Sequence, residues 1–379
     1  MSDPKAQQAN RTPRRPSLVA MVGPGLLLAA TGVGAGDLAT GSFVGSLLGT
    51  AVLWAVVVGA LMKFFVTEGL ARWQIATGET LLEGVTARAG RWTLWLFLPY
   101  LLLWSFFVGS ALMSATGATL HAILPVFSDA STGKIVFGAA ASLVGLGLVW
   151  VGGYRLFDHV MRVCIGVMFA TVVLMAVLLW PGIGAVLEGL FVPRIPEAGG
   201  QGVTWTLALI GGIGGTLTVL CYGYWLREEG RDSPQDLRLC RVDLTTGYVM
   251  TAIFGIAMVI IGSNVTIEGS GAQLLITLSD RLEIAMGPGG KWLFLIGTFG
   301  AVFSSLLGVW QCVAYLFADS WALLNGRRSD SLKIDTACIP YRAFLLAIAT
   351  IPIVGLFLRF SDVQILYAVI GACLFPALA

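Results

Sequence analysis

The chain has 379 residues, of which 57% are hydrophobic and only 12% are charged, and its mean hydropathy is +0.85. Soluble domains carry about 25% charged residues, so this composition excludes a soluble globular protein and indicates a polytopic membrane protein. There are two histidines in different segments and six cysteines without a Cys-x-x-Cys pair. A histidine metal cluster and a zinc site are therefore excluded, and we interpret the cysteines as small core side chains rather than disulfides.

The first apolar stretch is broken by glycine. Its middle holds three alternating glycines, Gly32, Gly34 and Gly36. Each costs about 1 kcal/mol of helix stability relative to alanine. Asp37 follows them directly and is the only charged residue between Arg15 and Lys63. A carboxylate at membrane depth usually faces a cavity or a partner, and a broken helix frees backbone groups that a bound ion can satisfy. We predict a cation or substrate site here; the alternative is a glycine-rich packing seam with Asp37 snorkelling to a nearby interface.

Ten apolar spans follow one another along the chain, each about the 20 residues that cross a bilayer. They cover residues 17–41, 47–75, 92–124, 134–150, 162–181, 202–226, 244–262, 291–324, 341–358 and 363–379. We expect a basic cytoplasmic tail at 1–16, a first five-helix repeat at 17–181, an extracellular linker at 182–201 and a second five-helix repeat at 202–379. The sequence stops inside the last span, so either it is truncated in the tenth helix or that helix ends the protein abruptly.

Lysine and arginine predict the orientation of these spans. With the N-terminus inside, 17 of the 23 Lys and Arg residues fall in inner segments and 5 in outer ones, while Lys63 lies within a span. Basic residues favour the cytoplasmic side of a membrane. We therefore predict a multi-pass protein of the cell (inner) membrane with a cytoplasmic N-terminus.

The two halves of the chain also show an internal symmetry. Five spans followed by five give the second half the opposite topology to the first, and the first span of each half is glycine-rich. The sixth span carries Gly211-Gly-Ile-Gly-Gly-Thr-Leu-Thr218. Paired interrupted helices in corresponding positions point to a midplane site in an inverted-repeat transporter. The alternative is that small residues merely let helices pack closely. We predict an all-α polytopic membrane protein with two inverted five-helix repeats and broken first and sixth helices.

Oxygen ligands are available at both predicted breaks. Asp37 is the leading metal ligand, and the carbonyl groups that end the first half-helix lie at the negative end of its dipole. In the sixth span the hydroxyl groups of Thr216 and Thr218 are the matching candidates. Gln364 could add a neutral oxygen from the tenth span; alternatively it is a helix-end residue near the outer surface. The predicted binding set is Asp37, Gly34, Thr31, Gly32, Thr216, Thr218 and Gln364.

Other charged residues have simpler interpretations. Glu68 and Arg72 are four residues apart in the second span, where an ion pair at the inner membrane edge is expected. The run Arg227-Glu-Glu-Gly-Arg-Asp232 is interpreted as a solvated cytoplasmic loop, with a gating role as the alternative. Asp319 is expected near the inner edge of the eighth span.

Several segments resemble the natural resistance-associated macrophage protein (Nramp) family of divalent-metal transporters. They run in the family's order over nearly the whole chain: Gly23-Pro24-Gly25, Gly34-Ala-Gly-Asp-Leu-Ala-Thr40, Ala71-Arg-Trp-Gln-Ile-Ala-Thr-Gly78, Tyr154-Arg155 and Ser304-Ser305-Leu-Leu-Gly308. The resemblance implies the ten-helix inverted-repeat fold known as the leucine-transporter fold.

This chain departs from the family at its metal ligands. The family's metal-binding Asp falls on Gly34 and its Asn falls on Asp37, so the acid has moved by about one helical turn. The Met-Pro-His of the family's sixth helix is absent, and the region reads Thr216-Leu-Thr-Val-Leu220. Branches of the superfamily that lack this methionine include magnesium transporters. The resemblance therefore implies a divergent member.

The predicted function is the transport of divalent metal ions, with Mg²⁺ or Mn²⁺ favoured, by alternating access. Because the third span has no acid or histidine before His121, we predict transport without proton coupling. The alternative is a transporter of a small organic solute such as an amino acid or amine, in which Asp37 pairs the amine.

A membrane sensor would more commonly carry a soluble domain. Motifs for nucleotides, phosphates or nucleophiles are missing, so we expect no enzyme, no cofactor and no nucleic-acid partner. The expected partners are the cation and the bilayer.

Overall fold

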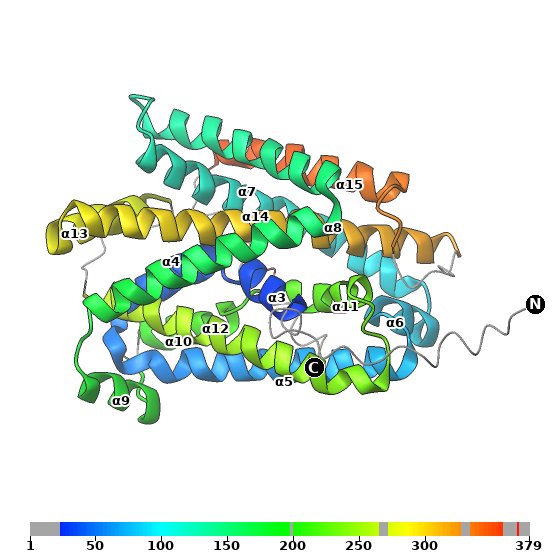
Figure 1. The fold of residues 1–379 in the computed structure, drawn as a ribbon, viewed down its shortest axis with the longest axis horizontal. Helices are drawn as coiled ribbons and strands as arrows, with labels where there is room; N and C mark the ends of the chain where they lie inside the picture. The colour runs from blue at the N-terminus through cyan, green and yellow to red at the C-terminus, as the bar shows by residue number, and fades with distance from the viewer. Residues whose placement is uncertain (1–22, 198–199, 265–271, 327–333, 359–369, 371–379) are drawn as a thin grey trace, which may run out of the picture.

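A computed structural model gives the fold, and it describes every residue except 1–22, 198–199, 265–271, 327–333, 359–369 and 371–379. The described residues form helices and contain no strand (Figure 1). Six helical segments among them are long and apolar enough to cross a membrane: Asp37–Thr77, Trp92–Ile123, Ala130–Leu178, Pro234–Ser263, Pro288–Leu324 and Ile339–Phe357. The second piece of the broken first helix lies almost entirely within the segment Asp37–Thr77, whereas its first piece and both pieces of the broken sixth helix are each too short to cross a membrane. The tenth span lies outside the described residues apart from residue 370.

The first half of the chain has its first helix broken, as predicted. Its elements are α3 (Pro24–Gly32), α4 (Ala35–Leu48), the 3₁₀ turn η1 (Gly49–Val52), α5 (Leu53–Thr77), α6 (Leu81–Ala89), α7 (Trp92–Ile123), α8 (Ala130–Leu178) and α9 (Ile183–Phe191). The predicted fourth and fifth spans form two helices within α8 that meet at a kink at Gly153, whose φ of +58° is a left-handed conformation that glycine adopts without strain.

The second half repeats the broken first helix. Its elements are α10 (Gln201–Gly212), α11 (Thr218–Glu228), η2 (Pro234–Asp236), α12 (Leu237–Ser263), α13 (Ala272–Met286), α14 (Pro288–Leu324), α15 (Ile339–Thr350) and η3 (Ile351–Phe357). The short helices α6, α9 and α13 connect the spans and were not expected from hydrophobicity, because each is too short to cross a bilayer.

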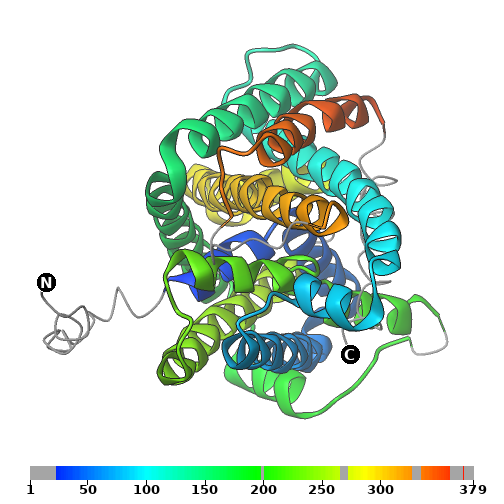
Figure 2. The ribbon, with the colours of Figure 1, turned by 90° about the vertical axis from the view of Figure 1, so that its right-hand side faces the viewer.

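The helices form two packed groups. One contains α7, α8, α14 and α15, and the other contains α4, α5, α10 and α12, as Figure 1 shows from the side and Figure 2 along the helices. The half-helices α3 and α11 lie between the groups: α3 contacts α12 and α14, and α11 contacts α5 and α14. The two broken helices therefore meet in the middle of the molecule.

The outer surface of the bundle is apolar. Phe65, Trp95 and Leu96 are all at least 60% exposed. Exposed apolar surface on this scale would be unfavourable in water, whereas lipid tails accept it. Large side chains such as those of Trp225 and Trp310 fill the interior of the bundle and are fully buried.

Candidate functional site

The two helix breaks touch one another through glycine. A methyl group added to Gly32, at the end of α3, would lie 2.5 Å from the carbonyl oxygen of Gly214. Gly214 and Gly215 have φ values of +77° and +70° between α10 and α11, which disfavour residues with a Cβ atom. Both breaks thus depend on glycine, the first for close approach and the second for backbone conformation.

Asp37 connects the two breaks. Its carboxylate accepts a hydrogen bond from the N–H of Gly34 at 3.4 Å, which caps the start of α4, and another from the N–H of Gly214 at 3.2 Å. The residue is 3% exposed. The snorkelling alternative is therefore wrong, because the carboxylate ends inside the protein against the second break.

A cavity of about 20 Å³ lies beside these contacts, which is room for about one water-sized species. It is lined by residues from both breaks and from α7 and α14: Thr31, Gly32, Gly34, Trp104, Val108, Ala111, Leu112, Gly215, Thr216, Thr218, Ser305 and Val309.

Three threonine hydroxyl groups in this cavity are unsatisfied. The Oγ1 atoms of Thr31, Thr216 and Thr218 are buried and have no hydrogen-bond partner among the residues that the structure describes. All three residues are less than 9% exposed. Buried polar groups are normally hydrogen-bonded, so three unpaired hydroxyl groups around one small space indicate a place for a bound species with which they interact.

Five of the seven predicted binding residues line this cavity. They are Thr31, Gly32, Gly34, Thr216 and Thr218. Asp37 stands next to the cavity and is held by the N–H of Gly34, while Gln364 lies outside the described residues. The described residues contain no group of three or more His, Cys, Asp or Glu side chains that could hold a metal ion. A cation bound in this part of the protein would therefore depend on hydroxyl and carbonyl oxygens together with one carboxylate.

Lys63 is a site residue that the sequence argument did not assign. It lies near the middle of α5, is 1% exposed, and donates hydrogen bonds from Nζ to the carbonyl oxygens of Gly211, at 3.0 Å, and Ile213. Its charge also interacts electrostatically with Asp37. The signal was present in the sequence, because an ionisable residue in the middle of a span indicates a functional site by default.

Glu68 forms the ion pair that its spacing predicted. It pairs with Arg72 on the same helix and also with Arg241 of α12, at 2.7 Å. Lys63 precedes Glu68 by five residues, a spacing that does not bring side chains together on a helix surface. Lys63 thus faces the break in the sixth helix while Glu68 faces α12.

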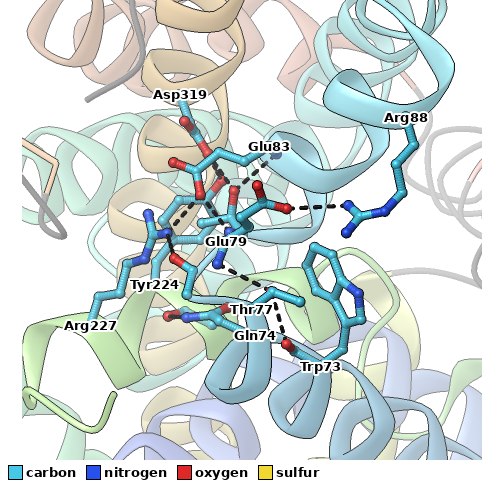
Figure 3. A network of polar contacts seen from close by, with 12 residues as sticks. Trp73, Gln74, Thr77, Glu79, Glu83, Arg88, Tyr224, Arg227 and Asp319 are labelled. Atoms are coloured by element: carbon cyan, nitrogen blue, oxygen red, sulfur yellow. Dashed lines mark hydrogen bonds and ion pairs between the residues drawn. The ribbon is translucent and has the colours of Figure 1, made fainter. Parts of the chain in front are cut away.

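A second polar cluster joins α6, α11 and α14 (Figure 3). We call it the inner network, and it consists of Thr80, Glu83, Tyr224, Arg227 and Asp319. Arg227 pairs with Glu83 at 2.7 Å, and Asp319 accepts hydrogen bonds from the hydroxyl groups of Thr80 at 3.0 Å and Tyr224 at 2.5 Å. The interpretation of the 227–232 run as a solvated loop is therefore wrong for Arg227, whose side chain is only 7% exposed.

Further contacts tie α11 to α14 nearer the cavity. Trp225 donates to Gln311 at 2.8 Å, and Cys221 forms a disulfide with Cys312 across a Cα–Cα distance of 5.5 Å. The expectation of unpaired core cysteines is thus wrong for these two. They lie 91 residues apart on different helices of the second half of the chain, so local spacing did not indicate the pairing.

Comparison with known proteins gives consistent results. The family described as "Natural resistance-associated macrophage protein-like" matches residues 25–379. A divalent metal cation transporter, MntH, of Chromohalobacter salexigens is 27% identical over 292 residues, which cover 73% of this chain and 64% of that protein. The chain thus spans less than two thirds of the length of this relative. An uncharacterised protein of Pasteurella multocida is 24% identical over 344 residues, covering 86% of this chain and 76% of that protein.

Solved structures show the same fold at low sequence identity. A manganese transporter of Eremococcus coleocola superposes with a TM-score of 0.69 at 14% identity, covering 94% of this chain and 76% of that one. A nucleobase-cation-symport-1 family transporter superposes with a TM-score of 0.62, also at 14% identity and with the same coverages. The predicted leucine-transporter-type fold, with inverted repeats and broken first and sixth helices, is confirmed.

Proposed function

Because the chain belongs to the natural resistance-associated macrophage protein-like family, we propose that it is a membrane transporter of divalent metal ions. One observation carries the proposal: the unpaired hydroxyl groups of Thr31, Thr216 and Thr218 surround a cavity with room for about one water-sized species, between two broken helices. The carboxylate of Asp37 does not line this cavity, but it accepts a hydrogen bond from the N–H of Gly34, which does, and it supplies negative charge. The name of the Chromohalobacter relative, a divalent metal cation transporter, supports the same class of substrate.

The ligand chemistry favours hard cations. Hydroxyl, carbonyl and carboxylate oxygens suit Mg²⁺ and Mn²⁺, whereas soft thiolate and thioether ligands select soft metals. Cys221, a candidate soft ligand on α11, does not line the cavity, and its sulfur is in a disulfide. We propose Mg²⁺ or Mn²⁺ as the substrate, with Cd²⁺ bound more weakly. Of the first two, the small cavity favours Mn²⁺, because Mg²⁺ gives up its water reluctantly.

We propose that transport proceeds by alternating access. The half-helices α3 and α11 carry the cavity and lie between the two helix groups, so relative movement of the groups would expose the cavity to one side or the other. The inner network would then be a closed contact between α11, α6 and α14, on the side that we assign to the cytoplasm.

Transport without protons remains part of the proposal. None of the residues that line the cavity carries a titratable acid, histidine or lysine. A driving force is available without protons, because two charges crossing about 100 mV gain roughly 4.6 kcal/mol. That energy corresponds to an accumulation of about a thousandfold.

Uptake of Mn²⁺ and Mg²⁺ into proteoliposomes under a potassium-diffusion potential tests the proposal. Thr216→Val and Thr218→Val keep the side-chain shape but remove a hydroxyl group from the cavity, and each should lower Mn²⁺ uptake at least about tenfold. Thr298→Val is the matched control, since Thr298 is a fully buried threonine with an unpaired hydroxyl outside the cavity, and its uptake should stay at the wild-type rate.

Two results would contradict the proposal. Uptake of an amino acid or amine with no uptake of metal would replace it with the organic-solute alternative. Acidification of the lumen that follows metal entry, measured with an internal pH-sensitive dye and compared with protein-free liposomes, would contradict uncoupled transport alone.

A further inference from the structure

One peptide group in the sixth-helix break is held by opposite charges at its two ends. The carbonyl oxygen of Ile213 accepts a hydrogen bond from the ammonium of Lys63, and the N–H of the next residue, Gly214, donates to the carboxylate of Asp37. The C=O and N–H groups of a trans peptide point in opposite directions. Lys63 and Asp37 therefore stand on opposite sides of this peptide, which connects them.

Lys63 is fixed in this place by several contacts. Its ammonium also binds the carbonyl oxygen of Gly211, so it fills the negative end of α10 that the break leaves open. A methyl group added to Gly214 would lie 3.8 Å from Lys63 Cδ, which places the lysine stem directly against the break. Lys63 thus places a positive charge at the second break, and Asp37 places a negative charge there.

The pair determines the charge of the empty site. A single buried carboxylate inside a membrane is strongly unfavourable unless another charge compensates it. The ammonium of Lys63 and the carboxylate of Asp37 bind the two ends of the Ile213–Gly214 peptide, so their opposite charges together leave the empty site with no net charge. A cycle in which the empty transporter must return across the membrane then requires no ion to neutralise Asp37.

Building on the proposed metal transport, we propose that Lys63 is the permanent counter-ion that lets the empty transporter change conformation without a bound cation. The same ammonium repels an incoming metal ion and so weakens its binding. Lys63 acts through Asp37 and the Ile213–Gly214 peptide, and is therefore a positioning residue rather than a metal ligand. Removing its charge should strengthen metal binding. It should also prevent the empty transporter from changing conformation, so that only the metal-loaded transporter moves between its two states.

The experiment compares Lys63→Met with the wild type and with a control, Lys291→Met. The control removes a lysine of α14 that pairs with Asp280 and Glu283 of α13. Mn²⁺ binding is measured by calorimetry on the full chain in lipid nanodiscs. Radioactive Mn²⁺ then reports two rates in proteoliposomes: net uptake into empty vesicles, and exchange into vesicles preloaded with Mn²⁺. Only net uptake requires the empty transporter to return.

Lys63→Met should bind Mn²⁺ at least about tenfold more tightly than the wild type. Its net uptake should fall at least about tenfold while its exchange rate stays close to the wild-type rate. Lys291→Met should match the wild type in all three. A purely structural role for Lys63 would lower binding, net uptake and exchange together.

Each other outcome has a defined meaning. Unchanged Mn²⁺ affinity in Lys63→Met, or parallel loss of net uptake and exchange, overturns the counter-ion role while wild-type uptake leaves metal transport intact. A wild-type protein that neither binds nor moves Mn²⁺ or Mg²⁺ overturns the proposed function, and the counter-ion role with it. If Lys63→Met does not fold, Lys63→Gln carries the same expectations, because its amide N–H can still donate to the carbonyl groups while the charge is gone.

Discussion

Replacing Asp37 with asparagine tests whether the buried charges are coupled. Asparagine keeps the size of the side chain and one of its two oxygens, so it can accept from the N–H of Gly34 or from that of Gly214, which donate to different oxygens of Asp37. It removes the negative charge, however, so the ammonium of Lys63 loses the opposite charge that stands across the Ile213–Gly214 peptide. Removing one partner of a buried ion pair destabilises a protein by about 3–5 kcal/mol.

The structure places Asp37→Asn at the lower end of that range. The ammonium of Lys63 retains the carbonyl groups of Gly211 and Ile213, so its charge stays partly solvated. We expect a loss of about 3 kcal/mol in the free energy of unfolding, and a similar loss for Lys63→Met, which leaves the carboxylate uncompensated. The double variant has no buried charge at this place and should lose about 3 kcal/mol rather than about 6, a coupling energy of about 3 kcal/mol.

Unfolding by SDS in mixed micelles, followed by tryptophan fluorescence, gives the four free energies of this cycle. The single variants, the double variant and the wild type are measured at one pH and one lipid-to-detergent ratio. If the two single losses add to within about 0.5 kcal/mol, the charges are independent and the coupling across the Ile213–Gly214 peptide does not exist. Mn²⁺ uptake by Asp37→Asn should be lost even in preparations that remain folded, since the site then has no carboxylate.

Three further changes test other parts of the structure. Gly214→Ala should lower the free energy of unfolding by about 1–2 kcal/mol, measured in the same SDS assay, because alanine is strained at a φ of +77°. Tyr224→Phe removes the hydrogen bond to Asp319, and a cysteine introduced into α11 should then react about tenfold faster with a thiol reagent added on the inner side. Tyr248→Phe, which removes a hydrogen bond between α5 and α12, should leave that labelling rate unchanged. A cysteine at Ser233 should resist an impermeant thiol reagent added outside intact cells, and ready labelling there would reverse the predicted orientation.

Hydrophobic periodicity and glycine placement were enough to predict the broken helices. The glycines around Gly32 and Gly214 lower helix stability locally, and that effect depends only on neighbouring residues. The lining residues that come from the breaks themselves followed from the same argument, because the half-helix ends are where backbone and hydroxyl oxygens become available, whereas the lining residues on α7 and α14 did not. Local sequence therefore contained most of the information about the two breaks.

Contacts between distant segments could not be predicted in this way. Lys63 reaches carbonyl groups about 150 residues away, and Arg227 reaches Glu83 across 144 residues. Neither pairing is visible in local composition, so the sequence places Lys63 only within the second span and predicts a solvated loop at Arg227. Both assignments treated a charge as a property of its own segment, whereas a buried charge takes its role from the element that packs against it.

The position of the carboxylate itself has a steric explanation. The resembling family carries its metal-binding Asp where this chain has Gly34, and a Cβ atom there would lie 2.7 Å from Oγ and 3.0 Å from Cβ of Ser305 on α14. Ser305 is held in place by a hydrogen bond to the carbonyl oxygen of Ala30, at 3.2 Å, so it has little freedom to retreat. The double variant Gly34→Asp with Asp37→Asn moves the acid back to the family's position, and it should not regain the Mn²⁺ uptake that Asp37→Asn loses. Its free energy of unfolding should be about 1–3 kcal/mol lower than that of Asp37→Asn alone, because the new side chain overpacks the site. Adding Ser305→Gly to this double variant makes room for the new side chain and should recover that loss. Uptake restored by the double variant alone would show that Ser305 does not exclude the family's arrangement.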